Sequence, residues 1–111
     1  MKTIKYNGKE YKMVSGTGSF EEKLRKEKIE YTVRTVPADF LIESMEVTSY
    51  YIKVYAYRSV KTNQKIYVAA VEWSDFEDVY SVIFQGTSEI TDDMAIALER
   101  AYHNHEFDKE V

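Results

Sequence analysis

Two histidines and several carboxylates near the C-terminus are the side chains whose types and spacing could bind a metal ion. Glu99 and His103 are four residues apart, which places them on one face of a helix at a spacing that suits a pair of metal ligands. His105 points about 200° around the same helix from His103, because each residue advances the helix by roughly 100°. A cation near a helix C-terminus is also explained by the helix dipole. We therefore predict no metal site.

Other residue patterns that could support catalysis are incomplete. The segment 15–19, Ser-Gly-Thr-Gly-Ser, precedes a predicted helix as phosphate-binding loops do, but it lacks the P-loop lysine, and Glu21 and Glu22 would repel phosphate. The chain has no Cys, which excludes thiol catalysis, zinc–thiolate sites and disulfides. Carboxylates such as Asp75 and Asp78 fall in a predicted turn, where nothing raises a carboxyl pKa for acid–base work. We therefore predict no catalytic residue and no cofactor site, and we expect the protein not to be an enzyme.

Aromatic side chains are the most distinctive feature of the composition, since the chain has ten Tyr, five Phe and one Trp. Tyr51, Tyr55 and Tyr57 lie along one side of a predicted strand with Lys53 among them, and Trp73 belongs to the next strand. The preference of Tyr for half-buried strand positions explains this stripe without any function. A protein contact surface is the second interpretation, because Tyr and Trp supply large contact areas. Stacking of unpaired nucleic-acid bases is the third, but an acidic chain lacks the attraction to phosphate on which such binding depends.

Charge is distributed unevenly along the chain, although the formal net charge is only −4. Residues 1–71 carry 13 basic and eight acidic side chains, whereas residues 72–111 carry two basic and eleven acidic side chains. A segment with a net charge of −9 can steer a basic partner or imitate a phosphate path. Ordinary solubility and helix capping explain the same acids without a partner. The residues predicted to contact a partner are Tyr51, Tyr55, Tyr57, Trp73, Glu72, Asp75, Glu77, Asp78, Asp92, Asp93 and Glu99.

The first third of the chain is predicted to form a hairpin, a short helix and a strand. The Asn-Gly pair at residues 7–8 supplies the two positive-φ positions of a type I′ turn, so the alternating residues on either side are expected to pair. Ser19 and Glu22 form a capping-box pattern, which predicts a helix that runs to about Ile29. Residues 31–36 alternate as a strand does, and a proline ends that pattern.

The remainder of the chain is predicted to form three strands followed by a helix. The strands are expected at about residues 48–59, 65–74 and 79–85, with short polar connections typical of an antiparallel meander. Thr91 is predicted to cap a helix that reaches about His105, with two Asp residues favourably placed in its first turn.

Together these elements predict one α+β domain over residues 1–111, with a mostly antiparallel sheet and two helices packed on one face of it. The sheet would consist of the N-terminal hairpin plus the three-stranded meander. Because the meander strands are apolar on both faces, either the N-terminal elements cover the second face or a Tyr-rich surface stays available to a partner. Residues 38–47 fit a strand, a short helix or a bend equally well, and residues 107–111 are expected to fray.

These features predict a small acidic protein that acts by binding another protein with a basic surface, and not by catalysis. Acidic single-domain chains without catalytic groups are typical of phage or bacterial stoichiometric inhibitors, immunity proteins and anti-defence proteins, including DNA mimics. One alternative is a sheet-based binder of single-stranded nucleic acid or of a small ligand, and another is a structural homodimer that buries the Tyr-rich face. The chain shows no signal peptide and no segment long enough to span a bilayer, so we expect a cytoplasmic location and no membrane contact.

Overall fold

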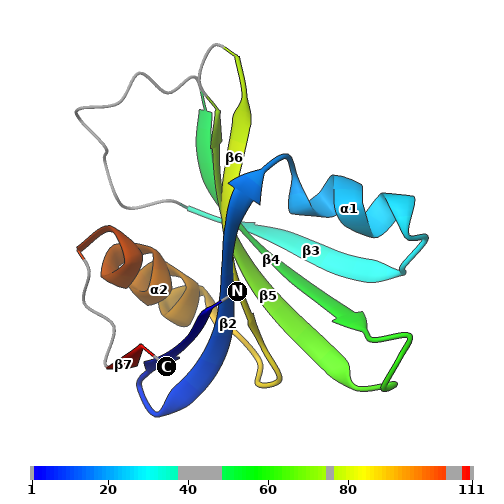
Figure 1. The fold of residues 1–111 in the computed structure, drawn as a ribbon, viewed down its shortest axis with the longest axis horizontal. Helices are drawn as coiled ribbons and strands as arrows, with labels where there is room; N and C mark the ends of the chain where they lie inside the picture. The colour runs from blue at the N-terminus through cyan, green and yellow to red at the C-terminus, as the bar shows by residue number, and fades with distance from the viewer. Residues whose placement is uncertain (1, 38–48, 75–76, 105–108, 111) are drawn as a thin grey trace.

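The sheet is the element on which both helices pack (Figure 1). The computed structural model describes residues 2–37, 49–74, 77–104 and 109–110. In these residues seven strands form one twisted antiparallel sheet in the order β3-β4-β5-β6-β2-β1-β7. The strands are β1 (Lys2–Tyr6), β2 (Lys9–Thr17), β3 (Tyr31–Val36), β4 (Ser49–Arg58), β5 (Lys65–Ser74), β6 (Val79–Gly86) and β7 (Lys109–Glu110), and the helices are α1 (Phe20–Lys26) and α2 (Asp92–Asn104). An α+β fold with an antiparallel sheet and two helices is therefore confirmed.

The predicted N-terminal hairpin is present, and it is joined directly to the meander. Asn7 and Gly8 have positive φ angles of 54° and 74°, as a type I′ turn requires, and β1 pairs with β2. On its other side β2 pairs with β6, where Met13 is opposite Phe84. The sheet is thus larger than a hairpin plus a three-stranded meander, since β3 extends it at one edge and β7 at the other. Alternation within a segment identifies a strand but does not show which distant strand it pairs with.

The two helices lie on opposite faces of the sheet, so the prediction that both pack on one face is wrong (Figure 1). Leu98 of α2 packs in one core cluster with Ile52 of β4, whereas Leu24 of α1 packs in a second cluster with Tyr55 of the same strand. Apolar side chains on both faces of β4 and β5 require a cover on each side to remove them from water. The N-terminal helix supplies the second cover, which is one of the two arrangements that the sequence left open.

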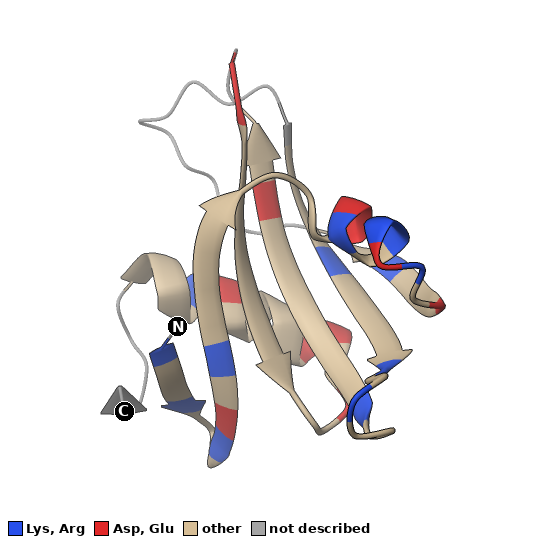
Figure 2. Cartoon of the chain, turned by 45° about the vertical axis from the view of Figure 1, so that its right-hand side comes forward, with Lys and Arg blue, Asp and Glu red and all other residues tan. Residues whose placement is uncertain are grey.

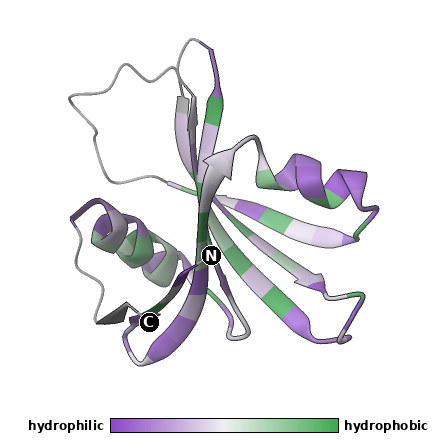
Figure 3. Ribbon diagram, viewed as in Figure 1, coloured by the Kyte–Doolittle hydropathy of each residue, from purple (hydrophilic) through white to green (hydrophobic). Residues whose placement is uncertain are grey.

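The helix α1 is short and mostly hydrophilic (Figure 3), and its buried residues are Phe20 and Leu24. Ser19 occupies the N-cap position, but its side chain makes no capping hydrogen bond, so the predicted capping box does not form. The helix ends three residues earlier than predicted, in a Schellman motif. The Ile29 amide donates to the Leu24 carbonyl, and Lys28 adopts a positive φ of 56°. Glycine usually occupies this position and marks the end of a helix in a sequence. Because this chain has a lysine there, the sequence does not indicate that the helix ends at this point.

The helix α2 begins where the sequence predicted. The Met94 amide donates a hydrogen bond to Thr91 Oγ1 at 3.2 Å, which confirms the threonine cap. Lys109 and Glu110 form β7 and pair with β1, so the expected fraying is wrong at these two positions. The segment 38–47, for which the sequence favoured no element, lies outside the described residues. Neither of the two described helices is long and apolar enough to cross a membrane.

Candidate functional site

Three aromatic rings from adjacent strands form a row on the α2 face of the sheet. Tyr50 of β4 is opposite Trp73 of β5, and Trp73 is opposite Tyr80 of β6. The ring centroids of Tyr50 and Trp73 are 6.4 Å apart at an interplanar angle of 28°, and those of Trp73 and Tyr80 are 6.1 Å apart at 25°. All three side chains are half-buried. We call Tyr50, Trp73 and Tyr80 the aromatic row.

The last turn of α2 places two further rings against the aromatic row. The His103 ring lies 6.1 Å from that of Tyr50 and 6.5 Å from that of Trp73. Tyr102 meets His103 edge-on at 5.3 Å and meets Phe84 of β6 edge-on at 6.2 Å. Such aromatic pairs contribute about 0.5–1.5 kcal/mol each beyond the area that they bury. Contacts with both the sheet and the helix therefore hold the row in one arrangement.

The carboxyl group of Glu99 lies inside the protein near this row. Glu99 is fully buried in α2, one helical turn before His103. Burial, followed by the hydrogen bond and the charge of Glu99, raises the pKa of Tyr50 well above its ordinary value. Tyr50 therefore stays a neutral phenol, with its oxygen 2.9 Å from His103 Nε2. Glu99 is not available to the acidic contact surface that the sequence predicted, because its side of α2 faces the sheet.

A pocket of about 310 Å³ opens beside the aromatic row. Three of its lining residues are aromatic: Trp73, Tyr80 and Tyr102. The others come from β2 and β6 and are Ser15, Gly16, Thr17, Ser81 and Val82. None of these lining residues has a carboxylate, ammonium or guanidinium group. The pocket therefore presents aromatic rings and hydroxyl groups to a ligand.

An acidic turn precedes β6, at the end of the sheet where β5 is followed by β6 (Figure 2). Glu77 and Asp78 are exposed and immediately precede β6, whose second residue is Tyr80. We call these two residues the acidic turn. Asp75, the third acid predicted here, lies outside the described residues. Two carboxylates thus lie close in sequence to Tyr80 of the row.

The other predicted acids lie at the opposite end of β6. Asp92 and Asp93 are exposed residues in the first turn of α2, which follows the end of β6. The acidic turn precedes β6 and these acids follow it, and β6 itself, with eight residues, is about 26 Å long. The Asp92 carboxylate is also paired with Arg34 Nε at 2.8 Å. The acids predicted as one surface are therefore two separate groups, at the two ends of β6.

The predicted Tyr stripe lies on the other face of the sheet from Trp73, and α1 covers its centre. Tyr55 is fully buried, and its ring lies 5.2 Å from that of Phe20. Tyr51 and Tyr57 on either side of it are half-buried. The four aromatic residues predicted to contact a partner thus do not form one surface, because residues 51, 55 and 57 of β4 face α1 and residue 73 of β5 faces α2.

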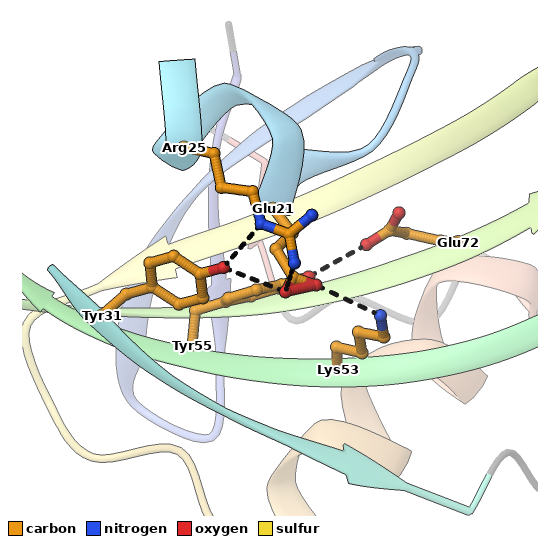
Figure 4. A network of polar contacts seen from close by, with 6 residues as sticks. All are labelled: Glu21, Arg25, Tyr31, Lys53, Tyr55 and Glu72. Carbon is orange, nitrogen blue, oxygen red and sulfur yellow. Dashed lines mark hydrogen bonds and ion pairs between the residues drawn. The ribbon is translucent and has the colours of Figure 1, made fainter. Parts of the chain in front are cut away.

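A network of polar contacts holds α1 against this second face (Figure 4). The Glu21 carboxylate accepts hydrogen bonds from the Tyr31 hydroxyl at 3.0 Å and from Arg25 at 3.2 Å. It also contacts the Lys53 ammonium at 3.5 Å. Burial alone would raise the pKa of Glu21, but the hydrogen bonds and positive charges of these partners lower it below its ordinary value. The charged form of Glu21 is therefore the one that the folded state favours.

Glu72 belongs to the same network and is fully buried. Its Oε1 accepts a hydrogen bond from the Tyr55 hydroxyl at 3.4 Å. Burial raises the pKa of Glu72 above its ordinary value, although the charge of Lys53 and the hydroxyl groups of Tyr55 and Ser19 oppose this shift. Opposite pKa shifts on two carboxyl groups also occur in acid–base sites, but Glu72 is closed off from solvent by α1. It is available neither to a substrate nor to the predicted acidic surface.

Sequence reasoning missed three residues of the candidate site. Tyr50, Tyr80 and Tyr102 were not predicted to contact a partner, although Trp73 was. Neighbouring strand residues point to opposite faces, and the chain alone does not show which face stays open. The signal that could have identified Tyr50 and Tyr80 is the strand register set by the two turns of the meander, which places Tyr50 opposite Trp73 and Trp73 opposite Tyr80.

In the part of the chain that the structure describes, no group of three or more His, Cys, Asp and Glu side chains is placed to hold a metal ion. Comparison with known proteins finds no matching family model, no matching curated protein and no matching solved structure.

Proposed function

We propose that this protein binds another protein that has a basic surface, and that it blocks this surface without catalysis. The observation that carries the proposal is the half-buried aromatic row beside the exposed acidic turn. Rigid aromatic side chains are frequent anchors of protein contacts, because they supply a large area at little loss of side-chain entropy. Acidic residues at the rim of such a contact attract a basic partner and speed association.

Occlusion is the mechanism that this arrangement supports. The aromatic row would fill a pocket or flat area at the centre of the contact, where water is excluded. The carboxylates of Glu77 and Asp78 would face basic side chains at the rim, where a phosphate-bearing or acidic ligand of the partner would otherwise bind. A partner covered in this way loses access to that ligand.

Two other occupants of the aromatic row are less favoured. Single-stranded nucleic acid could stack its bases on the rings, but its phosphates would meet the acidic turn, and phosphate attraction normally dominates such binding. A second copy of the chain would bring a second acidic turn to the contact, which like-charge repulsion opposes.

The test is retention of proteins from a lysate of the source organism on the immobilised chain, followed by mixing of the purified partner. Trp73→Ala and Tyr80→Ala shorten the aromatic row. Tyr67→Ala is the matched control, because Tyr67 is half-buried on the same face of β5 but lies at its other end. We expect one basic protein to be retained by the natural chain and by the control, and to be lost from both row variants. Circular dichroism melting checks that each variant is folded.

The acidic turn is tested with a second matched pair. Glu77→Gln combined with Asp78→Asn should slow association with the partner and reduce its dependence on salt. Glu89→Gln combined with Asp93→Asn removes the same charge at the far end of β6 and should change association less. Equal retention by all variants, or retention that nuclease treatment abolishes, would contradict the proposal.

A further inference from the structure

The pocket beside the aromatic row has the chemistry of a site for a positively charged side chain. Trp73, Tyr80 and Tyr102 line it, and the face of each ring carries partial negative charge that attracts a cation. Glu77 and Asp78, which precede β6, are exposed acidic residues near the same end of the sheet. Because none of the lining residues that the structure describes is basic, a cation that enters meets no like charge from them.

The shape and hydroxyl groups of the pocket favour arginine over lysine or an apolar side chain. A guanidinium is planar, stacks on aromatic rings and brings five N–H donors. The rings of Trp73 and Tyr80 lie within 25° of parallel and offer such a stacking surface. Ser15 and Thr17, which alternate onto this face of β2, supply hydroxyl oxygens that can accept the donors. A lysine ammonium has no plane to stack, and an apolar side chain would leave these hydroxyl groups without a ligand partner.

The size of the pocket agrees with this occupant. Its volume of about 310 Å³ corresponds to roughly ten water molecules at about 30 Å³ each. This space accommodates a guanidinium together with its aliphatic stem. A nucleotide base would also fit, but a nucleotide carries phosphate, which the exposed acids Glu77 and Asp78 near this end of the sheet disfavour.

We propose that this pocket receives an arginine side chain of the basic partner and anchors the contact. The inference rests on the proposed function and adds the group that the site recognises. It predicts that the pocket binds the arginine head group by itself, without the rest of the partner.

Trp73 is the only tryptophan of the chain, so its fluorescence reports on this pocket directly. The probe is arginine amide, and the control ligand is citrulline amide, which has nearly the same shape and the same α-amino group but an uncharged ureido group in place of the guanidinium. Titration of N-acetyltryptophanamide with both compounds corrects for collisional quenching. We expect a saturable change with arginine amide and a dissociation constant about 3- to 30-fold lower than that for citrulline amide, as a cation–π contact implies.

Pocket variants locate the binding. Tyr80→Leu removes one ring, and Thr17→Val replaces an exposed hydroxyl with a methyl group of similar size. Both should weaken arginine amide binding, whereas Tyr67→Leu at the other end of β5 should not. Because Thr17 is exposed, Thr17→Val keeps the test valid if Tyr80→Leu does not fold.

The possible results separate this inference from the proposed function. Equal responses to arginine amide and citrulline amide, or a linear response like that of free tryptophan, would overturn the arginine site. Partner retention that still depends on Trp73 and Tyr80 would then leave the proposed function standing. A tighter response to a single-stranded oligonucleotide than to arginine amide would overturn both.

Discussion

Gly86 is the position at which one added methyl group should have a clear effect on stability. A Cβ there would lie 3.1 Å from both Cδ1 and Cε1 of the Tyr11 ring and 3.6 Å from the Glu10 carbonyl oxygen. Tyr11 is only 1% exposed and packs in the core, so its ring cannot move without displacing its neighbours. We expect Gly86→Ala to lower the free energy of unfolding by about 1–3 kcal/mol, the range for overpacked interiors.

Urea unfolding followed by Trp73 fluorescence measures this effect. With an m value of about 1.5 kcal/mol/M, the expected loss lowers the urea midpoint by about 0.7–2 M. Gly16→Ala is the matched control, because Gly16 also lies in a strand and a Cβ there has nothing within 4 Å. This variant should keep the stability of the natural chain or raise it by up to about 1 kcal/mol, since alanine restricts the unfolded chain.

Tyr11→Leu completes the test as a double-mutant cycle. Removal of the ring opens space over residue 86, so Gly86→Ala should lower stability less in the Tyr11→Leu background than in the natural chain. Equal midpoints for Gly86→Ala and Gly16→Ala, or strictly additive effects in the cycle, would refute the reasoning. Either result would mean that the Tyr11 ring does not limit the space at Gly86.

Two further predictions concern charged groups. Glu72→Gln should have the same stability as the natural chain when the pH is below the ordinary Glu pKa of about 4.3, and it should become the more stable of the two as the pH rises above it. The reason is that burial raises the pKa of Glu72 in the folded state. The natural chain therefore loses stability as the pH rises from the ordinary pKa to the raised pKa. Urea unfolding at several pH values measures this, and a stability difference that does not change with pH would contradict it. Asp92→Asn breaks the exposed pair with Arg34 and should lower stability by at most about 1 kcal/mol, with the difference lost at high salt. Thermal unfolding at two salt concentrations checks this, and a larger loss that persists in salt would show that the pair is not screened.

Local signals in the sequence predicted most elements of the fold correctly. Asn7 and Gly8 form the expected turn, and Thr91 caps the second helix as expected. These features depend on the conformations open to a few adjacent residues, which the chain itself reveals. The end of α1 was predicted too late because Lys28 adopts a backbone conformation that glycine usually takes.

The candidate site was harder to predict because it depends on pairing between distant segments. Glu72 and Glu99 were expected on an acidic surface, yet both are fully buried. A charged residue in an amphipathic segment is normally exposed, and only the position of the facing helix or sheet shows that these two are not. Trp73 was among the aromatic residues predicted to contact a partner, whereas its neighbours Tyr50 and Tyr80 follow from strand register.

The pairing of β2 with β6 has a consequence for the order in which the chain can fold. Met13 and Phe84 face each other in the sheet, although about 70 residues separate them. At about 5–20 residues per second, the ribosome needs roughly 4–14 s to make that intervening chain. Throughout this time the completed hairpin of β1 and β2 has an open edge, and Tyr11 lacks most of its core contacts. The first structure able to form on the ribosome is thus among the last to be stabilised, and a nascent chain stalled before β6 would expose a strand edge prone to aggregation.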